Sequence, residues 1–280
     1  MLTSFTELLR ANQERGTALG SFTCYTFETA VAVVQAAQQR QRGVILLISE
    51  KSFAAPQGIY LVAGLRAIAE QAPIPVCLQL DHVSDLAQIE RACQMGVGSV
   101  MADGSRLTFE ENMTFVSQAV ALGKSYGVEI EAELGRVEGN EDIASAAAAG
   151  AFTDPKQAAL FAERAQPACL AVSIGNVHGI YRHPPQLDWL RLRQLRQSTT
   201  LPLSLHGASG LPDEDLRQAI RLGIAKINVN TELRASYFDL LHQQLAAMSS
   251  GLRLLELQHL LIEAQYHVSQ SKMQVYEQQA

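Results

Sequence analysis

The sequence predicts an α/β protein, and in particular a (β/α)8 TIM barrel, because short apolar segments alternate with amphipathic segments along most of its 280 residues. Eight apolar segments have the length and the branched or leucine-rich composition of buried parallel strands. The segments between them repeat apolar residues at helical spacing, and several end in glycine. No GxGxxG motif follows the first predicted strand, so a closed barrel fits better than a doubly wound sheet.

The elements follow one another in a regular order. The predicted strands lie at residues 17–24, 43–49, 74–80, 97–104, 127–135, 169–175, 201–207 and 225–230. The helices between them are predicted at 29–40, 61–71, 86–96, 112–127, 155–165, 189–197 and 212–223. Because a helical crossover returns the chain to the same edge of the sheet, this order requires parallel strands.

Two segments fall outside the repeat. Residues 136–154 are rich in glycine, alanine and acidic residues, which indicates a mobile loop over the site. Residues 252–280 have the polar spacing of one long helix, which either caps the barrel or contacts another subunit. We expect residues 1–280 to form a single barrel domain, with 252–280 as a C-terminal helical extension.

The composition limits the classes of partner. A net charge of −6 and the lack of a lysine and arginine cluster argue against nucleic acid. No run approaches the ~20 apolar residues of a membrane span, and the N-terminal residues are amphipathic rather than a secretory signal. The four isolated cysteines are typical of buried free thiols. We therefore expect a cytoplasmic protein.

Three histidines follow three of the predicted strands: His82, His178 and His206. Active sites of TIM barrels lie at the carboxyl ends of the strands, so these imidazoles can converge there. Catalytic zinc usually takes three protein ligands and keeps one position open for substrate or water. The pattern predicts a three-histidine metal site.

Asp81 immediately precedes one of these histidines. At the end of a strand, both side chains can face the mouth of the barrel. A carboxylate beside a metal ligand is well placed to move a proton on a substrate oxygen. Its alternative role is to cap the helix that begins near Ser84.

Further carboxylates lie on the next strands and on the predicted loop. Glu131 and Glu133 share one face of a strand, where buried charges are too costly to be idle, and Glu133 is a candidate alternate or outer metal contact. Among the acids of the loop, only one needs to be functional: Glu138, Glu141 or Asp142.

Turns follow the last three strands, in the glycine-bearing sequences NVHGIYR and HGASG and in INVNTE. Backbone amides in such turns and the start of a helix at Thr231 can cradle a phosphate group. Ser209 adds a hydroxyl donor and Arg182 adds charge. This is where TIM barrels commonly hold phosphate.

Five motifs carry a resemblance to a known family: LDH at 80–82, EAELG at 131–135, GNVHGIY at 175–181, LHGASGLP at 205–212 and KINVNTELR at 226–234. In this order they resemble the class II, metal-dependent fructose- and tagatose-bisphosphate aldolases, up to about residue 235. The resemblance implies a zinc ion bound by His82, His178 and His206, with Glu133 near its alternate position. It implies Asp81 as the acid/base at the C4 hydroxyl, and Glu141 as the base that takes a proton from dihydroxyacetone phosphate.

The resemblance also implies two phosphate sites. The triose phosphate would be held by Gly179, Arg182, Gly207, Ser209, Asn228 and Thr231. The far phosphate would contact Ser49 and Arg234, the latter from the same or a neighbouring subunit, and Asn230 would lie near the sugar. A monovalent cation is a further candidate cofactor, and a homodimer or homotetramer is the expected assembly.

Three departures from the family pattern bear on activity and assembly. Thr23 stands where relatives usually carry Asn, and Asn230 stands where Asp or Ala is frequent. The C-terminus has no Asp-Pro-Arg stretch, which bears on subunit packing.

The resulting prediction is a class II aldolase that reversibly cleaves fructose 1,6-bisphosphate to dihydroxyacetone phosphate and glyceraldehyde 3-phosphate. Fructose is favoured over tagatose because Val83, and not a second histidine, follows the DH pair. The alternatives are an aldolase for another phosphorylated keto sugar or keto-deoxy acid, and a non-catalytic aldolase-like subunit. A zinc hydrolase would need an HxH pair after the first strand, which SFTCYTF lacks.

Overall fold

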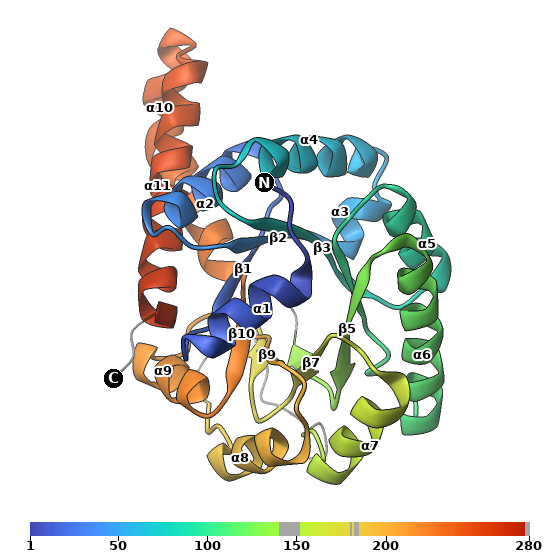
Figure 1. The fold of residues 1–280 in the computed structure, drawn as a ribbon. Coiled ribbons are helices and arrows are strands. Elements are labelled where there is room, and N and C mark those ends of the chain that lie inside the picture. The colour runs from blue at the N-terminus through green and yellow to red at the C-terminus, as the bar shows by residue number, and fades with distance from the viewer. Residues whose placement is uncertain (140–151, 180, 182–184, 278–280) are drawn as a thin grey trace.

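A closed barrel of eight parallel strands forms the centre of the molecule, as the sequence predicts (Figure 1). The structure is a computed structural model that describes residues 1–139, 152–179, 181 and 185–277. The strands are hydrogen-bonded in the order β1-β10-β9-β7-β5-β4-β3-β2, and β1 pairs with β2 and β10. They are β1 (Leu19–Thr23), β2 (Val44–Ser49), β3 (Val76–Val83), β4 (Ser99–Ala102), β5 (Glu129–Leu134), β7 (Cys169–Val172), β9 (Leu203–Leu205) and β10 (Ile224–Val229).

Helices surround this barrel, and their starts are fixed by local chemistry (Figure 1). Thr26, Thr108 and Asp154 cap α2, α6 and α7 by accepting hydrogen bonds from backbone amides. Gly127 ends α6 in the left-handed conformation that glycine adopts without strain. The outer helices are α2 (Phe27–Gln39), α4 (Gly58–Gln71), α5 (Leu86–Gln94), α6 (Phe109–Tyr126), α7 (Pro155–Ala165), α8 (Trp189–Ser198) and α9 (Asp213–Arg221).

Three short elements were not expected from the sequence. Helix α3 (Glu50–Ala54) directly follows β2. Strands β6 (Glu138–Gly139) and β8 (Val177–His178) pair in parallel outside the barrel. Because β8 lies beyond the end of β7, His178 extends from this small sheet and not from a barrel strand.

The interior of the barrel is apolar next to α1 and polar further along the strands. Helix α1 (Phe5–Glu14) buries Phe5 and Leu9 in an apolar cluster that also contains Ile45, Cys77 and Cys169. Further along the strands, the residues that alternate with the outward apolar ones are polar and buried: Gln79, Asp81, Glu131, Glu133, Ser204, His206, Lys226 and Asn228. The fold therefore places a polar core at the carboxyl ends of the strands.

The C-terminal part of the chain is a pair of long helices that projects past the barrel (Figure 1). Helix α10 (Thr231–Gly251) ends where Leu252 adopts a positive φ of 50°. Helix α11 (Leu254–Glu277) packs against α10 and α2, and its Tyr276 is buried and accepts a hydrogen bond from the Ala18 amide. The expected C-terminal extension is thus a helix, and it returns to the barrel wall. Among the described residues, no helix is long and apolar enough to cross a membrane.

Candidate active site

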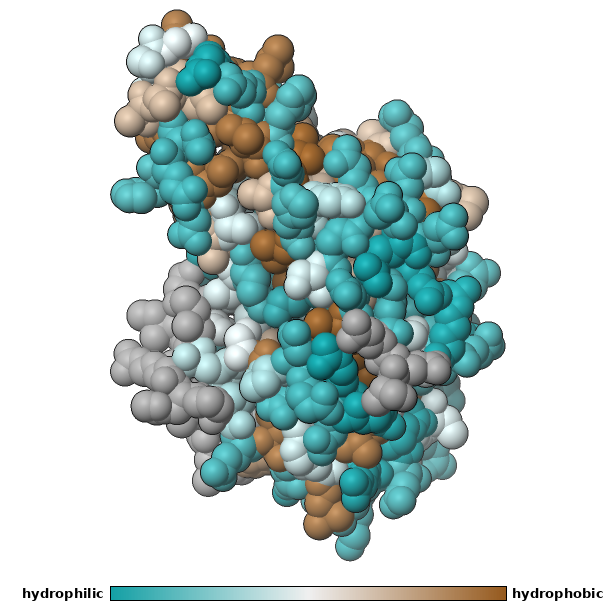
Figure 2. All heavy atoms as spheres, turned by 90° about the vertical axis from the view of Figure 1, so that its left-hand side faces the viewer, coloured by the Kyte–Doolittle hydropathy of each residue, from teal (hydrophilic) through white to brown (hydrophobic). Residues whose placement is uncertain are grey.

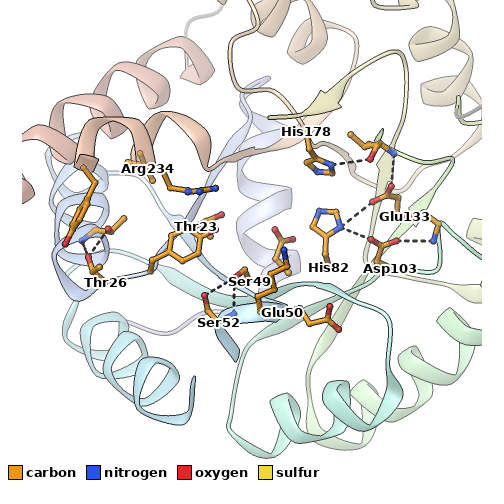
Figure 3. Close-up of a pocket in the computed structure, with 18 of the residues that line it drawn as sticks. Thr23, Thr26, Ser49, Glu50, Ser52, His82, Asp103, Glu133, His178 and Arg234 are labelled. Carbon is orange, nitrogen blue, oxygen red and sulfur yellow. Dashed lines mark hydrogen bonds and ion pairs between the residues drawn. The ribbon is translucent and has the colours of Figure 1, made fainter. Parts of the chain in front are cut away.

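A cavity of about 970 Å³ opens at the carboxyl ends of the barrel strands (Figure 3). It extends from the histidines toward α2 and α10. Its lining contains six of the residues predicted from the sequence: Ser49, Asp81, His82, Glu133, His178 and Arg234. Catalytic sites of TIM barrels occupy this position, so the cavity is the candidate active site.

Strand β3 presents two adjacent side chains to this cavity through a local change in its backbone. His82 has a positive φ of 54°, and the pairing of β3 with β4 shifts between Leu80 and Val83. This break in the strand alternation lets both Asp81 and His82 line the cavity. The following helix α5 is capped by Asp85, whose carboxylate accepts from the Ala87 amide. The alternative role of Asp81 as a helix cap is therefore wrong.

The structure brings the three predicted histidines together. The ring centroid of His82 lies 5.0 Å from that of His178 and 4.9 Å from that of His206. The candidate ligand atoms of all three lie within 4.8 Å of one another. Nε2 of His82 and Nδ1 of His206 are 3.0 Å apart. A single cation can be reached by all three rings.

Each ring is oriented by a hydrogen bond through its outer nitrogen. Nδ1 of His82 lies 2.8 Å from the Asp103 carboxylate, and Nδ1 of His178 lies 3.2 Å from the Val137 carbonyl oxygen. Nε2 of His206 lies 3.0 Å from Oε1 of Glu131. With a proton kept on each of these nitrogens, the opposite nitrogen of every ring is the candidate ligand atom. Metal-binding histidines are held in this way, so the donor set fits a zinc ion.

The charges of the site also fit a cation. Burial lowers the pKa of His82, but Asp81, Asp103 and Glu133 together raise it to about 10. Burial and the Asp103 charge raise the pKa of Glu133 to about 8, and its Oε2 has no hydrogen-bond partner among the described residues. The pKa of His178 is lowered to about 3 by burial and by the two other histidines. The surplus of carboxylates makes the site favourable for a metal ion.

Asp81 is held from inside the barrel. The Asn228 side-chain amide donates to both of its carboxylate oxygens, at 3.3 and 3.4 Å. Asn228 was expected among the residues that hold the triose phosphate. In the structure its side chain lies next to Asp81 and, at 3.3 Å, next to Nδ1 of His206, and its role at the phosphate stays a prediction. It therefore positions Asp81 in the metal-free enzyme.

The turns predicted to bind phosphate contain glycines in conformations that other residues rarely adopt. Gly179 and Gly207 have positive φ values of 94° and 58°. A Cβ at Gly207 would lie 2.3 Å from the Val177 carbonyl oxygen, so no other residue fits there. The Ser209 hydroxyl donates to Glu232, and the Gly210 amide donates to the same carboxylate at 3.2 Å. These bonds join the turn after β9 to the start of α10 near Thr231.

The residues expected at the far phosphate, Ser49 and Arg234, line the same cavity as His82 and His178 (Figure 3). Ser49 caps α3 and donates to the Ser52 hydroxyl at 2.9 Å. The Arg234 guanidinium lies 5.8 Å from the Tyr25 ring centroid, within the cavity of its own subunit. The Asn230 amide donates to the Tyr25 hydroxyl at 3.2 Å, and Thr23 also lines the cavity.

Some site residues were missed by the sequence analysis, and others lie outside the described residues. Asp103 directly follows strand β4, a position that signals function in a TIM barrel. Lys226 is a charge inside an apolar strand, the same signal that singled out Glu131. Glu141 and Arg182 lie outside the described residues, as do Asp142 and the side chain of Glu138.

Comparisons with known proteins show the family to which the chain belongs. The family model for class-II fructose-bisphosphate aldolase matches residues 3–279. The chain is 39% identical over 249 residues to "Probable fructose-bisphosphate aldolase" of Bacillus subtilis, covering 88% of this chain and 87% of the relative. It is 39% identical over 242 residues to "D-tagatose-1,6-bisphosphate aldolase subunit GatY" of Klebsiella oxytoca, covering 86% and 85%.

A solved aldolase structure is also similar to this chain. The crystal structure of the YdjI aldolase from Escherichia coli K12 superimposes with a TM-score of 0.86 at 29% identity, covering 99% of this chain and 97% of that one. Fold and site together define a lyase built on a TIM barrel. The chain belongs to the class-II fructose-bisphosphate aldolase family, in which zinc dependence is a shared property.

Proposed function

We propose that this aldolase cleaves fructose 1,6-bisphosphate reversibly to dihydroxyacetone phosphate and glyceraldehyde 3-phosphate, with zinc held by His82, His178 and His206. The convergence of the three ring nitrogens beside Asp81 is the observation that supports it most. Tagatose 1,6-bisphosphate is the second candidate substrate, because the two relatives named for these sugars are equally identical to this chain. Val83 favours fructose.

The chemistry follows from the positions of the protein groups. Zinc, when bound, supplies a Lewis acid that withdraws electron density from the ketose carbonyl. Asp81, held by Asn228, takes the proton of the C4 hydroxyl as the bond between C3 and C4 breaks. The electron pair of that bond stays on the triose phosphate fragment, and the aldehyde forms at C4.

The triose fragment then needs a proton at C3. We assign this transfer to Glu141, which removes the same proton in the condensation direction. Glu138 and Asp142 are the alternatives on the same segment. Glu133 remains a candidate for an alternate metal position, because it lines the cavity and its Oε2 has no hydrogen-bond partner among the described residues.

Two groups of residues would bind the phosphates. Amides of the Gly179 and Gly207 turns and the N-terminus of α10 at Thr231 suit the triose phosphate, and Ser209 would add a hydroxyl. From the sequence alone we assign Arg182 to the same phosphate. Ser49 and Arg234, which line the cavity, suit the far phosphate. A monovalent cation near the triose phosphate is a further proposed cofactor.

The test of this function is triose phosphate release from each ketose bisphosphate, measured after chelation and again after zinc is restored. We expect cleavage that is lost with chelator and returns with zinc. The ratio of the cleavage rates of the two ketose bisphosphates identifies the preferred sugar. Asp81→Asn should keep stoichiometric zinc and lose about 10²–10⁴-fold in turnover. Zinc-replete enzyme that cleaves neither sugar would point to another phosphorylated substrate or to a non-catalytic subunit.

We also propose that the protein is a cytoplasmic homodimer or homotetramer with one barrel domain per chain. Figure 2 shows apolar side chains gathered on the projecting part of α10 and α11. Leu245, Leu254 and Leu255 of these two helices are each more than half exposed. Light scattering coupled to gel filtration measures the assembly, and Leu254→Glu with Leu255→Glu should reduce its mass if this face is the contact.

A further inference from the structure

A buried ion pair lies inside the barrel directly below the histidines. Lys226 on β10 and Glu131 on β5 are both fully buried, and the lysine Nζ lies 3.0 Å from Oε2 of the glutamate. The Gln79 amide donates to the same carboxylate at 2.7 Å. Because an unpaired charge would be very costly here, each of the two charges requires the other.

The glutamate of this pair contacts a predicted metal ligand. Its Oε1 lies 3.0 Å from Nε2 of His206, which is fully buried as well. A carboxylate can only accept hydrogen bonds, so this contact places the imidazole proton on Nε2. Nδ1 is then left as the lone-pair nitrogen that faces Nε2 of His82, 3.0 Å away. Lys226 holds Glu131 in the orientation that selects this tautomer.

The lysine has a second contact that leads to the acid/base residue. Its Nζ donates to Oδ1 of Asn228 at 2.6 Å. With its oxygen engaged by the ammonium group, the Asn228 amide nitrogen is directed to Asp81, where it donates at 3.3 Å. One buried ammonium group therefore orients a metal ligand through Glu131 and the acid/base carboxylate through Asn228.

We propose that Lys226 is a positioning residue for both halves of the reaction: through Glu131 it fixes the metal-binding nitrogen of His206, and through Asn228 it fixes Asp81. This inference rests on the proposed function, because it takes His206 as a zinc ligand and Asp81 as the acid/base. Lys226 itself is not placed in contact with substrate.

The first measurement is zinc affinity, by competition with a chromophoric chelator, for wild type, Lys226→Met, Glu131→Gln and the double variant. Loss of an outer partner of a metal ligand typically costs about 10- to 100-fold in affinity, and we expect this for each single variant. In Glu131→Gln alone, the buried ammonium group of Lys226 competes with His206 for the one carbonyl oxygen of the glutamine. The double variant should recover most of the loss, because that oxygen can then accept from Nε2 of His206. Ser21→Ala, another buried polar position inside the barrel, is the matched control and should bind zinc as wild type does.

The second measurement is turnover at saturating zinc. Here the double variant should stay impaired, because the contact from Lys226 to Asn228 is still missing and Asp81 is no longer fixed. Recovery of zinc affinity without recovery of turnover separates the two contacts, and a purely structural role would not produce this split.

Lys226→Met with wild-type zinc affinity and turnover would overturn the inference. If that variant does not fold, the comparison of Glu131→Gln with the double variant tests the proposal. Equal zinc affinities of these two variants would contradict it. The His206→Ala variant distinguishes failure of the proposed zinc-ligand set from failure of the positioning role of Lys226. Stoichiometric zinc in His206→Ala would refute the proposed ligand set itself, whereas zinc loss there together with an unaffected Lys226→Met would refute only the positioning role.

Discussion

At the scale of single residues, the site depends on a backbone conformation that a histidine rarely adopts. The positive φ of His82 turns two neighbouring side chains to the same cavity, whereas a regular strand would direct them to opposite faces. Such a conformation costs on the order of 1–3 kcal/mol and persists only where the surroundings hold it. Here the hydrogen bond to Asp103 and the packing against two other imidazoles hold the ring.

The charge state of this cluster predicts proton release when zinc binds. In the metal-free enzyme the pKa of His82 is about 10 and that of Glu133 is about 8, so both groups hold a proton at pH 7. A bound cation requires a free His82 nitrogen and lowers the pKa of Glu133. We expect roughly one to two protons released per zinc at pH 7, falling as the pH rises through 8 and then 10.

Calorimetric titration in buffers of different ionisation enthalpy measures this number. An observed binding enthalpy that does not depend on the buffer at pH 7 would contradict the assigned charge states. His206→Ala, which is expected to lose the site, serves as the control for adventitious zinc.

At the scale of elements, the C-terminal helix contributes to the substrate side of the site. Lys272 of α11 forms an ion pair of 2.8 Å with Glu232 in the first turn of α10. Glu232 in turn accepts from the turn after β9, at Ser209 and Gly210. Burial raises the pKa of Glu232, but Lys272 and these bonds hold it below its usual value. The extension thus stabilises the proposed phosphate cradle.

Lys272→Met should weaken binding of the bisphosphate substrate. Glu232 would lose its cation and keep its negative charge close to the phosphate, so we expect KM to rise about tenfold, equivalent to roughly 1.4 kcal/mol. Zinc content should not change, because Lys272 is not among the histidine partners. Lys124→Met, at an exposed lysine of α6, is the matched control. Steady-state kinetics with KM equal to wild type would show that the ion pair does not act on the substrate.

At the scale of the whole molecule, the metal would join parts of the chain that are far apart in sequence. The three histidines lie on β3, on β8 and directly after β9. A ligand that binds only the folded state stabilises it by mass action, by about 4 kcal/mol at a free concentration 1,000 times Kd. Bound by these histidines, the proposed zinc would hold the mouth of the barrel together as well as take part in catalysis.

We expect zinc at that excess to raise the Tm of the chelated protein by roughly 8 to 16 °C, using about 2–4 °C per kcal/mol for a chain of this size. Scanning calorimetry with chelator and with zinc measures the shift. The same zinc should leave the Tm of His206→Ala nearly unchanged. An equal rise in both proteins would place the stabilising zinc elsewhere.

The sequence by itself determined the barrel, its eight strands, the three histidines and the neighbouring Asp81, because hydrophobic periodicity and strand ends are local properties that need no knowledge of the fold. The two phosphate-binding regions stay a prediction: Ser49 and Arg234, expected at the far phosphate, line the cavity together with the histidines.

Only the tertiary structure decided which partners these residues have. The tertiary structure alone gives the tautomers of the histidines, the capping of α5 by Asp85, the place of Asn228 beside Asp81, and the pairing of Lys226 with Glu131. These contacts join strands that are distant in the chain, such as β5 and β10. They depend on the register of each strand and on the closure of the barrel, which no local pattern encodes.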